Sequence, residues 1–234
     1  MLDIENISST LRKGDPILLF DETDREGETD IFFSAKYASN SSIRFLRNNG
    51  GGMIFLAADT LASTKLGLPF AHDIYQTVIN SNNDFSILEK MLNHSIPYDK
   101  KSSFSIFINH KDTFTGISDY DRALTSKSFA SIFEESLQLS KSEAQEKLSQ
   151  NFRIPGHVPV CIADPELLKA RQGHTELIVA LFKFLGINPV AVGCEMIGSS
   201  GSSMSSEEAK SWASNEGYLF LEGRQIMEEC QWGS

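Results

Sequence analysis

The sequence predicts an α/β (α+β) fold: one layered domain in which helices flank a mixed sheet. Short apolar runs alternate with helical stretches along all 234 residues, which is typical of layered α/β architectures. Several runs are apolar at every position, as expected for strands that are buried on both faces. No Pro- or Gly-rich linker divides the chain, so we expect a single domain over residues 1–234.

Seven runs are expected to form strands because they are short, apolar and bounded by turn-forming residues. They cover residues 17–20, 31–33, 53–58, 104–108, 158–162, 190–194 and 218–221. Helices are expected at residues 35–47, 129–148, 176–185 and about 207–216. Ser34 is a suitable N-cap for the first helix, and Gly186 is a suitable stop for the third. The serine-rich stretch 198–206 should be a flexible loop before the last helix.

Composition excludes several classes of protein. With 41% hydrophobic and 22% charged residues, the chain can bury a sizeable core and does not resemble a disordered segment. No apolar run approaches the roughly 20 residues of a membrane helix, and the N-terminus lacks a signal-peptide pattern, so we expect a cytoplasmic protein without a membrane partner. The formal charge of -10 disfavours a nucleic-acid partner. Cys161, Cys194 and Cys230 lack metal-site spacing and should be reduced thiols.

Signature motifs exclude further classes. The sequence has no G-x-x-x-x-G-K-[ST], H-E-x-x-H or G-x-S-x-G, and no G-x-G-x-x-G linked to a strand. The sequence therefore lacks the signature motifs of P-loop NTPases, zincins, α/β-hydrolases and Rossmann-fold enzymes. The run Gly50-Gly51-Gly52 predicts a tight turn before a strand rather than a phosphate cradle.

An acidic segment links the first two expected strands. Between residues 21 and 30 it contains six carboxylates and one arginine, and it is longer than a simple hairpin turn requires. Clustered carboxylates repel one another unless they hold a hard cation, and Mg²⁺ prefers oxygen ligands. The segment is therefore a candidate metal site, with a solvated acidic turn as the alternative.

A second segment, at residues 169–176, combines Arg171 and Gly173 with the start of an apolar helix. The first amides of a helix are unpaired, a glycine allows close approach and an arginine adds charge, so the segment suits a phosphate monoester. The alternative is an ordinary helix cap made by His174 or Thr175.

Two further groups lie at the ends of expected strands. His157 precedes one strand and Glu195 ends another, and ligand sites in α/β folds gather at strand ends, so these groups can converge on one crevice. The polar turn 114–123 is less specific, because Ser118 or Asp119 can simply cap the helix that follows.

Five motifs along about residues 12–200 resemble 3,4-dihydroxy-2-butanone 4-phosphate synthase of riboflavin biosynthesis. They are Asp-Arg-Glu-x-Glu-x-Asp at 24–30, T-G-I-S-x-x-D-R-A at 115–123, P-G-H-V at 155–158, R-x-G-H-T-E at 171–176 and C-E-M at 194–196. This family converts D-ribulose 5-phosphate to L-3,4-dihydroxy-2-butanone 4-phosphate and formate with Mg²⁺, as a homodimer with active sites near the subunit interface. The resemblance thus implies a homodimeric carbon–carbon lyase that uses Mg²⁺ or Mn²⁺.

Carried over by position, the resemblance implies that Glu26 and His174 are the metal ligands. It marks His157 and Glu195 as essential, and with Asp30 these are the candidate catalytic acids and bases. The implied substrate contacts are Arg25, Glu26, Asp30, Arg171, Gln172, Gly173, His174, Thr175 and Glu195.

The chain departs from the family pattern at a few positions. Thr29, Gly27 and Phe55 stand where the family usually has glycine, asparagine and cysteine. Many bacterial relatives continue into a GTP cyclohydrolase II domain, and this sequence ends before one, so we expect a monofunctional enzyme.

The residues suit the implied chemistry. Removing a proton beside a ketose carbonyl leaves an enediolate, which a cation held by Glu26 and His174 can stabilise. Asp21 and Glu28 are candidate outer partners of the acid and base groups. Two other functions remain. One is another Mg²⁺-dependent sugar-phosphate aldolase or isomerase, which formate release would exclude. The other is a non-catalytic sugar-phosphate sensor, which would need the anion site at residues 171–175 but not the pair His157 and Glu195, whose presence counts against it.

Overall fold

The structure is a computed structural model that describes residues 2–81, 83–94, 96, 99 and 101–230. Its strands are β1 (Ile17–Phe20), β2 (Thr29–Ser34), β3 (Phe55–Ala58), β4 (Phe104–His110), β5 (Phe152–Ile162), β6 (Val190–Glu195) and β7 (Leu219–Glu222). Its α-helices are α1 (Ile4–Lys13), α2 (Asn40–Asn49), α3 (Leu61–Thr64), α4 (Ala71–Ser81), α5 (Ser86–Leu92), α6 (Asp119–Ser136), α7 (Lys141–Asn151), α8 (His174–Phe184), α9 (Ser206–Glu216) and α10 (Gly223–Glu229). Short 3-10 turns are η1 (Ala35–Tyr37), η2 (Asn83–Phe85) and η3 (Leu167–Lys169).

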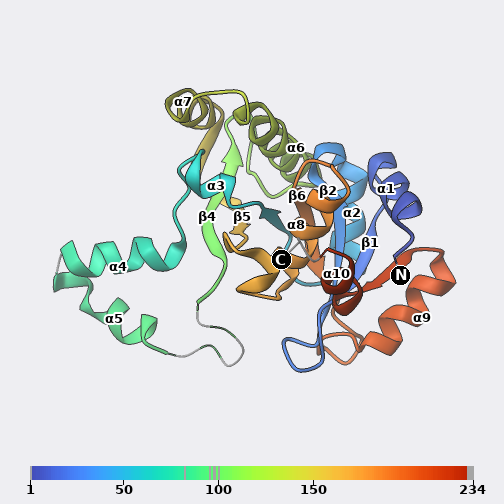
Figure 1. The fold of residues 1–234 in the computed structure, drawn as a ribbon. Helices are drawn as coiled ribbons and strands as arrows, with labels where there is room; N and C mark the ends of the chain where they lie inside the picture. The colour runs from blue at the N-terminus through green and yellow to red at the C-terminus, as the bar shows by residue number, and fades with distance from the viewer. Residues whose placement is uncertain (1, 82, 95, 97–98, 100, 231–234) are drawn as a thin grey trace.

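The strands form one mixed sheet in the order β4-β5-β3-β6-β2-β1-β7 (Figure 1). β1 is parallel to β7 and β3 is parallel to β5, whereas the other neighbouring pairs are antiparallel. All seven expected strands are present, and the expected mixed sheet flanked by helices is confirmed. β5 begins earlier than expected, so the segment 155–157 lies within this strand and not before it.

Helices cover both faces of the sheet. In β1, Leu18 points to one face while Ile17 and Leu19 point to the other, and all three are fully buried. The Leu18 face packs against α2, α6 and α9, and the opposite face packs against α1, α8 and α10. The first nine residues of α8 are all buried, which anchors the start of this helix beside the sheet.

Two expected helices are split in the structure. The segment 35–47 forms η1 and then α2, because the hydroxyl of Ser39 accepts a hydrogen bond from the backbone N–H of Ser42 and starts a new helix. The segment 129–148 forms α6 and α7, because Ser140 caps α7 through the N–H of Glu143. The last two expected helices are confirmed as α8 and α9, whereas α1, α3, α4, α5 and α10 were not predicted.

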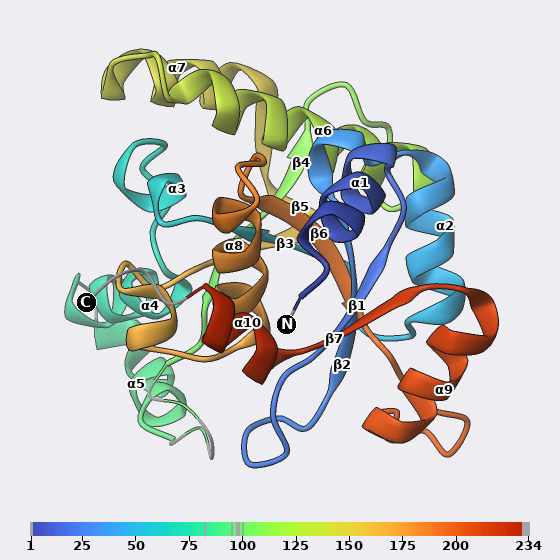
Figure 2. The ribbon, with the colours of Figure 1, turned by 45° about the vertical axis from the view of Figure 1, so that its right-hand side comes forward.

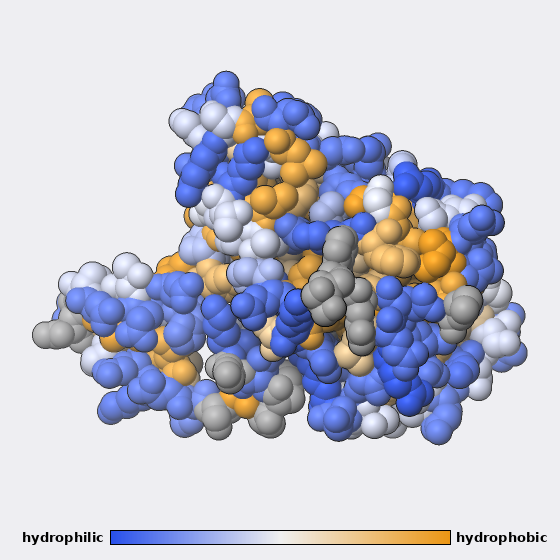
Figure 3. Space-filling view, in the orientation of Figure 1, coloured by the Kyte–Doolittle hydropathy of each residue, from blue (hydrophilic) through white to orange (hydrophobic). Residues whose placement is uncertain are grey.

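The helices α4 and α5 form an arm that projects from the body of the molecule (Figures 1 and 2). None of the residues described in these two helices is buried, although apolar residues recur at helical spacing in α4, at Ala71, Ile74, Tyr75, Val78 and Ile79. The space-filling view shows apolar side chains along the hollow between this arm and the body (Figure 3). Figure 2 also shows the β1–β2 loop extending past the end of the sheet.

Two further sequence expectations can be compared with the structure. Cys161, Cys194 and Cys230 are all buried and free, as expected. Within the described part of the chain, no helix has both the length and the apolar character needed to cross a bilayer.

Gly193 in β6 packs directly against β2, and a Cβ at this position would lie 2.4 Å from Phe32 Cε1. We expect Gly193→Ala to lower the free energy of unfolding by about 1–3 kcal/mol, as overpacking of a core does. Urea unfolding measures the change, with Gly198→Ala as the control because its Cβ would meet its nearest neighbour at 3.4 Å. Equal stability of the two variants would contradict this role of Gly193.

Candidate active site

The β1–β2 loop folds around the buried carboxylate of Asp21. Oδ2 of Asp21 accepts hydrogen bonds from the backbone N–H of Glu26 and from the guanidinium of Arg25, both at 3.1 Å. Oδ1 accepts from the backbone N–H of Glu28 at 3.0 Å. Asp21 is fully buried and accepts three hydrogen bonds from the loop, so it fixes the backbone positions of Glu26 and Glu28. The loop is therefore an organised structure and not a solvated acidic turn.

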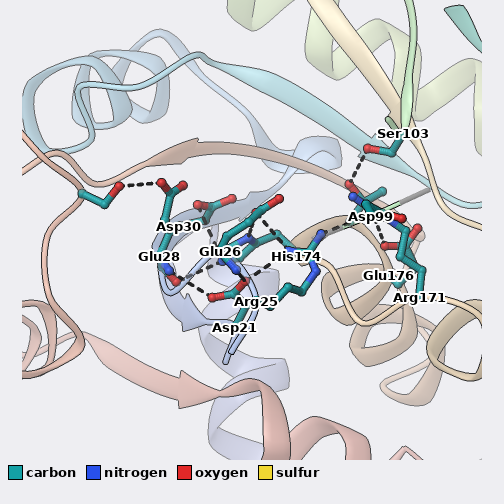
Figure 4. Close-up of polar contacts among 12 residues, drawn as sticks. Asp21, Arg25, Glu26, Glu28, Asp30, Asp99, Ser103, Arg171, His174 and Glu176 are labelled. Carbon is teal, nitrogen blue, oxygen red and sulfur yellow. Dashed lines mark hydrogen bonds and ion pairs between the residues drawn. The ribbon is translucent and has the colours of Figure 1, made fainter. Parts of the chain in front are cut away.

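The start of α8 brings His174 into contact with this loop (Figure 4). Nδ1 of His174 lies 3.3 Å from Glu26 Oε2, and Nε2 lies 3.2 Å from the backbone oxygen of Glu28. Nε2 is also 3.8 Å from Asp30 Oδ1. Gly173 is the N-cap of α8 and no side chain caps the helix, so the alternative of an ordinary cap made by His174 or Thr175 is wrong.

The charges of this cluster stabilise one another. A backbone carbonyl can only accept a hydrogen bond, so Nε2 of His174 carries a proton. Burial alone would lower the pKa of His174, but the charge of Asp30 and the hydrogen bond with Glu26 raise it from 6.5 to about 9. Burial alone would raise the pKa of Glu26, but His174 and Arg25 lower it from 4.5 to about 2. At neutral pH the pair is an imidazolium and a carboxylate.

Asp30 and Glu195 lie directly opposite each other on β2 and β6. Burial raises the pKa of Asp30 from 3.8 to about 8, although the charge of His174 opposes it, and burial also raises the pKa of Glu195. Glu195 Oε2 accepts from the backbone N–H of Met53 at 2.7 Å. Gly52 makes this possible, because a Cβ there would lie 2.2 Å from that oxygen. The glycine run thus forms the expected turn and also holds Glu195.

Arg171 is engaged by two carboxylates (Figure 4). Its Nη1 donates to Glu176 Oε2 at 2.6 Å, and its Nε donates to Asp99. Burial raises the pKa of Glu176, and the charge of Arg171 opposes this. Asp99 also lies 3.7 Å from Arg25, so its carboxylate lies between the two arginines that the resemblance assigns to the substrate.

These groups surround a cavity of about 300 Å³. Most of the expected substrate contacts line it: Arg25, Glu26, Asp30, Arg171, His174, Thr175 and Glu195. Gln172 and Gly173 do not line the cavity. Gly173 nevertheless leaves room for Arg25 and Arg171, because a Cβ at this position would lie 2.7 Å or less from a guanidinium nitrogen of each. A cavity of this size with convergent polar groups suits a small polar substrate.

His157 lies outside this cavity, so the structure does not bring it together with Glu195 within the chain. It is exposed on β5, and its Nδ1 lies 3.0 Å from Asn109 Nδ2 on β4. The pairing of β4 with β5 shifts between Ile108 and Asn109, so the segment 154–157 bulges from the sheet.

Sequence reasoning missed three residues that shape this region. Asp99 and Asn109 belong to no motif, and their contacts are visible only in the folded chain. Glu176 belongs to the helix-start motif and directly precedes an apolar run. A carboxylate followed by six buried apolar residues signals burial with a cationic partner.

The donor atoms fit a hard divalent cation. One ligand atom from each of Asp21, Glu26 and His174 lies within 4.8 Å of the others. Carboxylate oxygens and an imidazole nitrogen suit Mg²⁺ or Mn²⁺. Asp30 Oδ1 is buried without a hydrogen-bond partner among the described residues, and a bound cation or polar ligand would satisfy such an atom.

The profile of the 3,4-dihydroxy-2-butanone 4-phosphate synthase family matches residues 5–229. The chain belongs to this family. It is 40% identical over 229 residues to the 3,4-dihydroxy-2-butanone 4-phosphate synthase of Archaeoglobus fulgidus, a match that covers 97% of this chain and 94% of that protein. The synthase of Methanothermobacter thermautotrophicus is 38% identical over 226 residues, covering 96% and 94%. The chain is therefore an enzyme of riboflavin biosynthesis, as the five motifs predicted.

Solved structures of 3,4-dihydroxy-2-butanone 4-phosphate synthases share the enzyme's fold. One, in complex with two magnesium ions, has a TM-score of 0.74 at 21% identity and covers 98% of this chain and 96% of its own. The enzyme of Candida albicans has a TM-score of 0.72 at 24% identity and covers 99% of each chain.

A cation that binds Nδ1 of His174 would compete with the proton on that nitrogen, so its affinity would depend on pH. A cation needs an unprotonated nitrogen, and the folded protein retains the Nδ1 proton until the pH approaches about 9. We therefore expect Mg²⁺ affinity to rise between pH 7 and pH 9, by up to about tenfold per unit, and to level off above that range. Isothermal titration with Mg²⁺ measures this, and His174→Gln should bind weakly without the rise. A constant wild-type affinity over this range would contradict the prediction.

Proposed function

We propose that the enzyme converts D-ribulose 5-phosphate to L-3,4-dihydroxy-2-butanone 4-phosphate and formate, with Mg²⁺ or Mn²⁺ as its cation. The observation that carries the proposal is the contact of His174 with Glu26 and Asp30 at the polar cavity. Membership of the synthase family supports it. The cavity also brings a cation site and an anion site together, as a ketose phosphate requires.

Glu26 and Nδ1 of His174 would hold the cation, with Asp21 beside them. When bound, a divalent cation polarises the ketose carbonyl and offsets negative charge on the enediolate oxygens. Nε2 of His174 keeps its proton and its hydrogen bond to the carbonyl of Glu28, which fixes the orientation of the ring.

Asp30 and Glu195 are placed to move protons on the substrate. They face each other across β2 and β6, and both line the cavity. Burial raises the pKa of Asp30 to about 8, so this carboxyl group can take up and release a proton close to neutral pH. Burial also raises the pKa of Glu195, which makes its carboxylate a stronger base than an exposed glutamate. Asp30 and Glu195 together can therefore supply one acid and one base.

The phosphate group of the substrate would bind beside Arg171 at the N-terminus of α8. The first N–H groups of this helix have no side-chain cap, and helix N-termini favour anions. The hydroxyls of Ser103 and Thr175 lie 3.4 Å apart and line the same cavity, so both can donate to phosphate oxygens. A dianion in this position competes with Asp99 for Arg171.

We expect a homodimer in which His157 completes the partner subunit's active site. His157 is exposed and lies outside the cavity of its own chain. Phe107 and Ile154 on the antiparallel pair β4 and β5 are 41% and 63% exposed. Large apolar side chains exposed together are typical of a protein interface.

The reaction can be tested directly. The purified enzyme with ribulose 5-phosphate and Mg²⁺ should release formate, which NMR detects, and Glu26→Gln should reduce turnover by at least about 10³-fold while unfolding at a similar temperature. Glu207→Gln, on the surface of α9, is the matched control and should keep wild-type turnover. Consumption of substrate without formate would instead support an aldolase or isomerase, and binding without consumption would support a sensor.

Shared active sites predict complementation between two inactive variants. Glu26→Gln and His157→Ala should each be nearly inactive, because every site lacks one needed group. After mixing and subunit exchange, half of the dimers are mixed and each has one complete site, so activity should recover to about a quarter of the wild-type value. Mixed dimers that form without recovering activity would contradict the placement of His157 in the partner's site.

Phosphate recognition predicts a selective effect at Arg171. Arg171→Lys keeps a positive charge beside the buried Glu176. A lysine cannot make the bidentate contact that a guanidinium makes with a phosphate group. We expect kcat/KM for ribulose 5-phosphate to fall by roughly 10- to 150-fold, equivalent to about 1.5–3 kcal/mol. The residual activity on unphosphorylated ribulose should change little. Equal proportional losses on both substrates would show that Arg171 does not recognise the phosphate.

A further inference from the structure

Asn109 is a buried polar residue to which neither the sequence motifs nor the proposed mechanism assigns a role. It lies on β4, 2% exposed, and its side-chain amide faces the histidine of the neighbouring strand. Oδ1 accepts a hydrogen bond from the backbone N–H of His157 at 2.9 Å. Nδ2 lies 3.0 Å from Nδ1 of His157 and 3.5 Å from the backbone oxygen of Thr115.

These partners fix the orientation of the amide. The backbone N–H of His157 can only donate, so it must face the amide oxygen. The carbonyl of Thr115 can only accept, so it must face the amide nitrogen. Both partners therefore require the same orientation, in which Nδ2 donates towards the imidazole. An NH₂ group cannot accept a hydrogen bond, so Nδ1 of His157 must be the acceptor and carry no proton.

Two glycines of the sequence motifs make room for this arrangement. A Cβ on Gly116 would lie 2.1 Å from Asn109 Nδ2, and Gly116 has a φ of +95°, which few other residues adopt. A Cβ on Gly156 would lie 1.9 Å from the carbonyl carbon of Ile108. The T-G-I-S and P-G-H motifs therefore meet at Asn109.

The Gly116 turn is itself held in place. Asp121 Oδ2 accepts from the backbone N–H of Gly116 at 2.8 Å and from the hydroxyl of Thr115 at 3.3 Å. Ser118 then caps α6 through the N–H of Asp121. The turn that supplies the Thr115 carbonyl to Asn109 is thus fixed by the start of a long helix.

We propose that Asn109 is a positioning residue that holds His157 as a neutral imidazole protonated on Nε2. This inference rests on the catalytic role proposed above for His157. The exposed imidazole ring on β5 then presents an N–H donor from Nε2. It stabilises a developing oxyanion by donating a hydrogen bond and does not remove a proton, because its only unprotonated nitrogen is bound to the amide. Proton abstraction is left to the carboxylates of the cavity.

The wild-type enzyme provides the first test, which does not depend on any variant folding. Nitrogen-15 NMR of histidine-labelled protein at pH 7.5 distinguishes protonated from unprotonated ring nitrogens, and the His157 signals are assigned by their loss in His157→Gln. We expect an unprotonated Nδ1 and a protonated Nε2. A protonated Nδ1 would overturn the proposal, whatever the outcome of the formate assay.

The second test replaces the amide with a carboxylate of the same shape. In Asn109→Asp the oxygen that replaces Nδ2 accepts a hydrogen bond, so the proton should move to Nδ1 of His157. We expect the NMR pattern to change accordingly and kcat to fall by roughly 10²-fold or more, with KM nearly unchanged.

Asn151→Asp is the matched control for this change. Its amide donates to the carbonyl of Lys147 on α7 and does not contact His157, so both the NMR pattern and kcat should stay as in the wild type. A loss of activity in Asn109→Asp with the wild-type NMR pattern would overturn the proposal, because it would indicate a purely structural role. If the enzyme releases no formate while Nδ1 is unprotonated, the proposed function fails but the positioning by Asn109 stands.

Discussion

The contact between His174 and the carboxylates of the β1–β2 loop is the constraint on which the rest of the site depends. His174 and Glu26 are 148 residues apart in sequence, yet their side chains are 3.3 Å apart. A buried imidazolium is stable only with negative partners, and buried carboxylates need a positive one. The loop and the start of α8 therefore require each other. Because α8 is buried along the sheet and Asp21 fixes the loop from within, the geometry is set by the core of the domain.

A second set of charges organises the other end of the cavity. Glu176 is fully buried and paired with Arg171, and Asp99 lies between Arg171 and Arg25. The arginines are therefore neutralised by carboxylates when no anionic ligand is bound. A phosphate dianion carries more charge than the Asp99 carboxylate and can accept more hydrogen bonds, so it is a stronger partner for the same two arginines. These ion pairs stabilise the two arginines at the cavity until an anionic ligand binds.

Features that depend on neighbouring residues in the sequence could be predicted, and features that depend on contacts between distant segments could not. All seven strands were predicted from short apolar runs, and the signal is most complete in β1, β2 and β3, where every residue is buried. The helix starts at Ser39 and Ser140 were not predicted. The helical pattern continues across each serine, whereas in the structure the serine caps a new helix. The family motifs singled out Glu26 and His174, and the structure brings their side chains into contact, while their role as cation ligands stays a prediction. Asp99 and Asn109 were not found, because their roles come from tertiary contacts that no sequence spacing records.

The most direct measurement of the central contact is anomalous diffraction from crystals of the enzyme grown with Mn²⁺. The account predicts an anomalous peak within bonding distance, about 2.0–2.3 Å, of a carboxylate oxygen of Glu26 and of Nδ1 of His174. The hydrogen bond from Nε2 to the carbonyl of Glu28 should remain. A peak bound only by other residues, or coordination through Nε2 with that hydrogen bond broken, would contradict the account.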